Sequence, residues 1–194
     1  MARNKKVFSF VDLILIAIFT TLICLIAPLT FNSTGFFVST DRLDLINFPF
    51  TAATAIICFT AAVLGFKRSL ICVVLYLVLG ALGLPVFSGY TGGYGLFTGS
   101  HLGYLVGYLA LASITGLIVD RNKKNAYMYF VGMLAGVAAC LLLGFLWMLI
   151  IPGFSLAGAF AAGFVPFIFT ECTKIFISGM IAYPIRAILL KKIL

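Results

Sequence analysis

Residues 99–151 read GSHLGYLVGYLALASITGLIVDRNKKNAYMYFVGMLAGVAACLLLGFLWMLII, two apolar runs (99–119 and 126–151) joined by a short basic turn. Each run has the roughly 20 residues that an α-helix needs to cross the hydrocarbon core of a bilayer. The turn carries Arg121, Lys123 and Lys124, and such residues concentrate in the cytoplasmic loops of membrane proteins. The stretch therefore predicts two antiparallel membrane-spanning helices with a cytoplasmic connection.

The same alternation of apolar run and basic junction continues in both directions along the chain. Further apolar runs cover residues 7–29, 48–66, 69–84 and 167–190. With six spans, eleven of the thirteen lysines and arginines fall on one side of the membrane, and five or seven spans would break this pattern. We therefore expect an all-α membrane protein, one domain over residues 1–194, with six spanning helices and both termini in the cytoplasm.

The composition excludes a water-soluble domain. Hydrophobic residues make up 63% of the chain and charged residues only 9%, against roughly 25% in soluble domains, and the mean hydropathy is +1.23. The net charge of +8 is gathered at the ends of the apolar runs, so we attribute it to membrane orientation and not to nucleic acid. The first run is as long as a span and lacks a cleavage site, which favours a retained helix over a signal peptide.

No motif for catalysis, a cofactor or a metal ion is evident, and we expect no enzyme. The five cysteines each lie in an apolar run without a C-x-x-C pair, so we interpret them as small apolar side chains. The single histidine has no neighbouring cluster of metal ligands. A nucleotide-binding motif is also missing, so uphill movement of a solute would need a partner or an ion gradient.

Three long, nearly uncharged segments are expected on the outer side, at residues 30–47, 85–98 and 152–166. Irregular backbone cannot lie against lipid, because its hydrogen-bonding groups would go unpaired. We therefore expect these loops to fold over an outward-facing pocket, although ordinary extracellular connections are the alternative.

Glu171 is the only glutamate of the chain, and Lys174 is the only lysine inside an apolar run. A separation of three places both on one face of a helix, in the outer third of the sixth span. Ionisable side chains inside a span are costly and usually face a cavity or the bundle interior. The two residues predict either a ligand-binding pair or an ion pair that only fixes helix packing.

Aromatic residues and glycines mark the outer ends of the third and fourth spans. His101, Tyr104 and Tyr108 share a face of the fourth span, where they could line a ligand or form an interfacial aromatic belt. A tyrosine offers a flat apolar face with a polar tip, which suits a small heterocycle, and glycines allow close approach of the backbone. The preceding loop supplies further candidate binding residues, Tyr90, Gly92, Gly93 and Tyr94.

Ala17 and Thr21 form a small-x-x-x-small pair in the first span. Such pairs let helices pack closely within a membrane. The pair therefore predicts either packing inside the bundle or a docking face for another membrane subunit.

Four segments, in order, resemble the BioY family, the biotin-capturing membrane subunits of energy-coupling-factor (ECF) transporters. They are FPFTAATAIICFTAAVLG (48–65), VLYLVLGALGLPVF (74–87), GSHLGYLVGY (99–108) and the Pro166-Phe167…Glu171-x-x-Lys174 pattern. The resemblance implies a six-helix bundle in a prokaryotic plasma membrane with biotin bound at its outer face. It also implies a membrane scaffold subunit that docks at Ala17 and Thr21, and two ATPase subunits.

The chain departs from the family pattern at several positions. Glu171 stands where the family has Asp, and Ser100, His101 and Leu102 replace a Pro-Thr-Gly. These changes leave open a biotin precursor or another vitamin as the ligand. Two other classes also remain: a stand-alone carrier in which Glu171 is a coupled protonation site, and a lipid-modifying enzyme in which Glu171 is the base.

Overall fold

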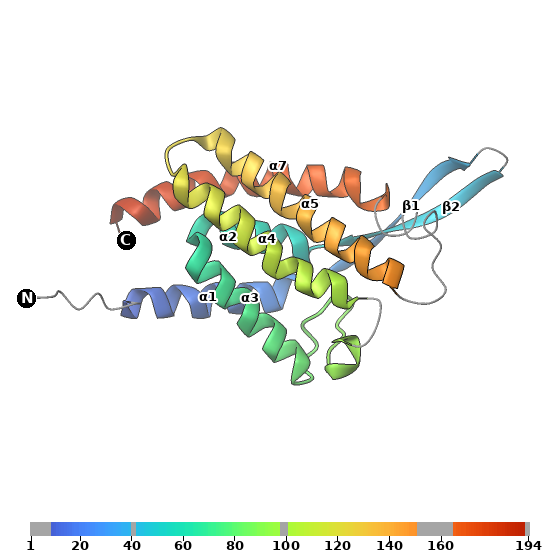
Figure 1. The fold of residues 1–194 in the computed structure, drawn as a ribbon, viewed down its shortest axis with the longest axis horizontal. Helices are drawn as coiled ribbons and strands as arrows, with labels where there is room; N and C mark the ends of the chain where they lie inside the picture. The colour runs from blue at the N-terminus through green and yellow to red at the C-terminus, as the bar shows by residue number, and fades with distance from the viewer. Residues whose placement is uncertain (1–8, 40–41, 98–100, 151–164, 193–194) are drawn as a thin grey trace, which may run out of the picture.

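The computed structural model describes residues 9–39, 42–97, 101–150 and 165–192. Across these ranges it contains six α-helices that lie side by side (Figure 1). A short 3-10 helix, η1 (Tyr94–Phe97), precedes α4. The helices are α1 (Phe10–Ile26), α2 (Ala53–Leu64), α3 (Phe66–Ala81), α4 (Leu102–Arg121), α5 (Ala126–Ile150) and α7 (Val165–Lys192). Every expected span is therefore present as a helix, and the six-helix prediction is confirmed.

The helices differ in length and in how much of their surface faces outward. Among the described residues, three segments are long and apolar enough to cross a membrane, Leu102–Arg121, Ala126–Ile150 and Thr170–Lys191. The central helix α2 contacts α1, α3, α4, α5 and α7, and ten of its twelve residues are buried. Twelve residues span only about 18 Å, against about 30 Å of hydrocarbon. The start of α2 lies below the outer end of α7, because Thr54 meets Glu171 six positions after α7 begins.

Small residues bring α4 and α5 close together. A Cβ added at Gly107 of α4 would lie 3.0 Å from the Cys140 carbonyl oxygen of α5, so the two backbones approach closely there. Thr115 of α4 also donates its hydroxyl to the Gly132 carbonyl of α5 at 3.0 Å. The apolar runs at residues 99–119 and 126–151 thus form the antiparallel helix pair α4–α5 that the sequence predicts (Figure 1).

A β-hairpin takes the place of the first expected outer loop. β1 (Thr30–Ser39) and β2 (Arg42–Thr51) pair antiparallel, with Thr30 opposite Thr51, and project from the end opposite the chain termini (Figure 1). The prediction of a loop over residues 30–47 and of a helix from residue 48 was wrong. Strand pairing satisfies the backbone groups of the two segments with each other, which a loop would leave to lipid or water.

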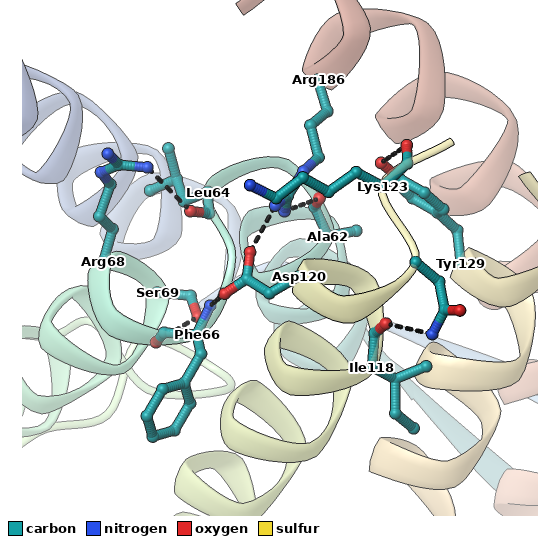
Figure 2. A network of polar contacts seen from close by, with 11 residues as sticks. Ala62, Leu64, Phe66, Arg68, Ser69, Ile118, Asp120, Lys123, Tyr129 and Arg186 are labelled. Carbon is teal, nitrogen blue, oxygen red and sulfur yellow. Dashed lines mark hydrogen bonds and ion pairs between the residues drawn. The ribbon is translucent and has the colours of Figure 1, made fainter. Parts of the chain in front are cut away.

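The basic end of the bundle is held together by two acidic residues. Asp120, near the end of α4, accepts a hydrogen bond from the Phe66 N–H at 2.9 Å and an ion pair from Arg186 of α7 (Figure 2). Arg186 also donates to the Ala62 carbonyl at 2.9 Å. Asp12 of α1 pairs with Arg68 of α3 at 2.8 Å. These contacts tie α1, α4 and α7 to the α2–α3 turn.

Candidate functional site

A cavity of about 150 Å³ lies at the end of the bundle opposite the basic turns. Its walls come from α3, the loop that follows α3, and the first two turns of α4. Aromatic and hydroxyl side chains line it together with one imidazole and one leucine. The lining residues are Tyr76, Phe87, Ser88, Thr91, His101, Leu105 and Tyr108.

Three aromatic rings form the buried wall of this cavity. Phe87 meets Tyr76 edge to face at 5.3 Å between ring centroids, and Tyr76 lies 6.5 Å from the ring of Tyr108. A Cβ at Gly80 would overlap the Phe87 ring, so the glycine makes room for it. Tyrosine and phenylalanine faces in this arrangement offer an apolar slot suited to a flat or compact ring.

The rim of the cavity is a tight turn that carries two hydroxyl groups. The Phe87 N–H donates to the Thr91 carbonyl at 3.0 Å, and the Thr91 hydroxyl donates to the Ser88 carbonyl at 3.0 Å. Gly89 ties the turn to the end of α1 through a hydrogen bond to the Pro28 carbonyl. Tyr90 has a φ of 58°, a left-handed conformation that costs energy in a residue other than glycine.

Glu171 and Lys174 form a buried cluster with Thr54. The Lys174 Nζ lies 2.6 Å from the Glu171 Oε1, and only 3% of each residue is exposed. The Thr54 hydroxyl donates to the same carboxylate oxygen at 2.8 Å and lies 3.1 Å from the Lys174 Nζ. Thr54 stands in the first turn of α2, so the short central helix sets the depth of the cluster.

The second carboxylate oxygen of Glu171 is buried and has no hydrogen-bond partner among the described residues. A buried carboxylate is an acceptor, and leaving one of its oxygens unpaired costs free energy that a donating ligand would recover. The other buried side-chain atoms without a partner among the described residues are the Thr20 and Thr60 hydroxyls and the Arg186 Nε, so Glu171 carries the one carboxylate oxygen of this kind there. The cluster therefore has the capacity to accept an N–H or O–H group from a bound molecule.

The cluster lies near the cavity but does not line it. Glu171 and Lys174 are not among the residues that line the cavity. Tyr108, which does line it, lies within electrostatic reach of Glu171. Cys58 and Cys140 lie within similar reach of both charged residues. The pair is therefore buried near Tyr108 but is not part of the cavity lining.

The α4 residues named from the sequence separate in the structure. His101, at the start of α4, lines the cavity together with Leu105 and Tyr108, which follow it by four and seven positions. Tyr104 instead packs against Gly144 of α5 and approaches the Met148 Sδ at 3.8 Å. The face of α4 toward the cavity therefore carries Leu105 in the place that the sequence suggested for Tyr104.

The loop residues named from the sequence lie outside the cavity wall. Tyr90 and Tyr94 are 63% and 73% exposed. A Cβ at Gly92 would overlap the Leu84 carbonyl, and Gly93 has a φ of 101° and donates to the Gly80 carbonyl at 2.8 Å. Both glycines are therefore explained by packing of the loop against the end of α3, and not by contact with a ligand.

Sequence reasoning missed most of the cavity wall. Tyr76 and Leu105 belong to apolar runs and Phe87 to the loop between them, and nothing in the sequence separates these residues from lipid-facing ones. Ser88 and Thr91 carried a weak signal, because two hydroxyls flanking Gly-Tyr in an outer loop are typical of a turn. Across the described ranges, no group of three or more histidine, cysteine or acidic side chains gathers as a metal site would require.

Ala17 and Thr21 lie on the exposed face of α1. The Thr21 hydroxyl donates to the Ala17 carbonyl at 2.9 Å, which satisfies it within its own helix. Apolar side chains surround this small patch, and many are largely exposed, including Leu13, Ile14, Ile18 and Leu25. The patch faces away from the bundle, so it does not serve the internal packing of the six helices.

Comparison with known proteins matches residues 2–191 to the BioY family. The biotin transporter BioY of Thermotoga maritima is 32% identical over 71% of this chain and 80% of its own length. The biotin transporter BioY of Rhizobium etli is 28% identical over 90% of this chain and 95% of its own.

A solved structure agrees with these sequence matches. The crystal structure of the S-component for biotin from an ECF-type ABC transporter superposes with a TM-score of 0.77 at 25% identity, covering 96% of this chain and 95% of that one. Its fold is that of a multi-pass protein of the prokaryotic plasma membrane. A family match over nearly the whole chain and a shared fold place this protein in the BioY family.

Proposed function

We propose that this chain captures biotin at the outer face of the membrane, as the substrate-binding subunit of an ECF-type transporter. The observation that carries the proposal is the buried Thr54–Glu171–Lys174 cluster, with its unpaired carboxylate oxygen, near an aromatic cavity. The relatives named biotin transporters and the matching S-component support biotin over other small vitamins.

Biotin carries two ureido N–H groups on a compact bicyclic ring and a carboxylate on a flexible tail. The ring would sit between the aromatic side chains, with its ureido N–H groups donating to Glu171. Lys174 would donate to the ureido carbonyl or to the carboxylate. His101, at the rim, is the other candidate partner for the carboxylate.

Binding would require the aromatic wall to move. A cavity of about 150 Å³ holds a molecule the size of benzene, and biotin is larger. Tyr108 lines the cavity and lies near Glu171, and the turn that carries Phe87 and Thr91 forms the rim. An outward shift of this turn would enlarge the cavity and let the ring reach the cluster.

The remaining candidate residues would not contact biotin directly in this proposal. Tyr90, Tyr94, Gly92 and Gly93 would contribute through the position of the loop, and Tyr104 would support the wall from behind through α5. Ala17 and Thr21 would dock a membrane scaffold subunit, which with two ATPase subunits would supply the energy. A stand-alone proton-coupled carrier and a lipid-modifying enzyme are not favoured, since the relatives are transporters of one family.

The test is equilibrium binding of labelled biotin to purified protein beside Glu171→Gln and Lys174→Ala. Each variant should bind about tenfold to a hundredfold more weakly, as expected for loss of a hydrogen bond to a charged group. The matched control is Ile177→Ala, an exposed position on the same helix. Unchanged affinity in both cluster variants would exclude the cluster from the site, and no binding by the folded native protein would exclude biotin.

A further inference from the structure

The α4–α5 turn presents three unpaired cations on the basic end of the bundle. Arg121, Lys123 and Lys124 are exposed, and within the described ranges none lies at ion-pair distance from a carboxylate. The nearby Asp120 is already engaged by Arg186 and by the Phe66 N–H. The turn encloses an open recess of about 370 Å³, lined by these cations with Asp120, Asn122 and Asn125.

Two tyrosines from different helices fix the backbone of this turn. The Tyr129 hydroxyl of α5 donates to the Lys123 carbonyl at 3.2 Å (Figure 2), and the Tyr183 hydroxyl of α7 donates to the Lys124 carbonyl at 3.4 Å. The two rings meet edge to face at 5.2 Å. The recess is therefore a preorganised cationic site, and little backbone entropy would be lost when an anion binds.

An apolar groove of about 220 Å³ lies next to the turn, between α5 and α7. Its first residue, Tyr127, follows Asn125 of the recess by two positions, so the groove begins within one helical turn of the recess along the chain. Its lining is aliphatic and aromatic with one thiol, and much of it is exposed. The lining residues are Tyr127, Phe130, Val131, Leu134, Cys172, Ile175 and Phe176.

The basic turn and the groove together span about one half of a bilayer. Tyr183 of α7 touches the turn, and Cys172 lies eleven positions earlier on the same helix, which corresponds to about 16 Å. Half of the hydrocarbon core is about 15 Å thick. The far end of the groove, at Cys172, thus lies at about the middle of the membrane.

We propose that the basic turn and the adjoining groove bind one anionic phospholipid. Arg121, Lys123 and Lys124 would hold its phosphate, and one acyl chain would lie in the groove between α5 and α7. Tyr127 stands where the headgroup meets the chains, a depth at which tyrosine is enriched in membrane proteins. Basic residues near a membrane surface favour anionic over zwitterionic lipid, so the site selects by charge as well as by shape.

Native mass spectrometry of the purified full chain, titrated with phosphatidylglycerol or phosphatidylcholine of identical acyl chains, tests the headgroup contact. Lys123→Gln/Lys124→Gln should lower phosphatidylglycerol occupancy about tenfold and leave phosphatidylcholine unchanged. The control Lys67→Gln/Lys191→Gln removes the same charge from exposed positions outside the recess and the groove. Equal loss in both double variants, or no loss in the first, would overturn the proposal.

A second pair of variants tests the acyl-chain groove. Leu134→Trp should fill the groove and weaken the binding of phosphatidylglycerol. The control, Leu142→Trp, changes a similarly exposed leucine of α5 outside the groove. If Leu134→Trp has no effect, the lipid does not use the groove. If inorganic phosphate displaces phosphatidylglycerol at equal concentration, the recess is a site for free phosphate and the lipid assignment fails.

Discussion

The two ends of the bundle each hold a cluster of charged side chains, buried at the outer end and partly exposed at the basic end, and the clusters are anchored differently. At the basic end, both carboxylate oxygens of Asp120 have partners, one of them a backbone N–H, and Arg186 binds a backbone carbonyl. At the outer end, Glu171, Lys174 and Thr54 bond one another through a single carboxylate oxygen, and the other oxygen is unpaired. The first arrangement fixes a turn between helices, and the second keeps an acceptor available for a ligand.

The largest expected effect follows removal of one partner of the outer pair. Lys174→Met would leave Glu171 buried without its cation and lower the free energy of unfolding by about 3–5 kcal/mol. Glu171→Gln/Lys174→Met removes both charges, so stability should return close to that of the native protein while biotin binding stays lost. Unfolding titrations in detergent with parallel binding assays measure both. A double variant as unstable as the single one would mean that the outer pair is a structural anchor like the inner one.

A smaller loss of stability is expected at the basic end. Asp120→Asn keeps the shape of the side chain but removes the charge that pairs with Arg186, which should cost about 2 kcal/mol. Biotin affinity should stay within about twofold, because the site lies at the opposite end of the bundle. The same unfolding and binding assays apply, and a large loss of affinity with intact stability would contradict the division between the two ends.

Crowding the aromatic wall should weaken binding with little effect elsewhere. Gly80→Ala would push the Phe87 ring out of place and lower biotin affinity about tenfold, at a cost of about 1–3 kcal/mol for overpacking. Gly95→Ala is the matched control, because a Cβ there meets open space. Equal biotin affinities of the two variants would show that the cavity is not part of the biotin-binding site.

The smallest effect on the isolated chain is expected on the exposed face of α1. Ala17→Leu should change the stability by no more than about 0.5 kcal/mol and leave biotin affinity unchanged. Its effect should appear in co-purification with a co-expressed ECF scaffold subunit, where a larger side chain would block close helix packing. Ala187→Leu on α7 makes the same change at another exposed alanine. Equal recovery of the scaffold with both variants would exclude Ala17 from the docking face.

The helices could be predicted from the sequence because lipid imposes a simple rule of length and polarity. The basic turn at Arg121–Lys124 marked one helical hairpin, and Glu171 and Lys174 stood out as costly residues inside a span. The β-hairpin was missed because the second strand, Arg42–Thr51, continues directly into the apolar residues of α2, and a continuous apolar run does not show where a strand ends and a helix begins. The cavity was missed for a related reason: Tyr76 and Phe87 differ from lipid-facing aromatic residues only in which way their helix or loop turns.

One hydrogen bond at the base of the β-hairpin connects α1, which carries Ala17, to α2, which carries Thr54. The Ala52 N–H donates to the Leu29 carbonyl at 3.1 Å, joining the outer end of α1 to the start of α2. Thr54 follows two residues later and touches Glu171. A partner that binds at Ala17 and tilts α1 would therefore also move Thr54. The base of the hairpin would in this way couple docking of the partner to the Thr54–Glu171–Lys174 cluster and to release of the ligand.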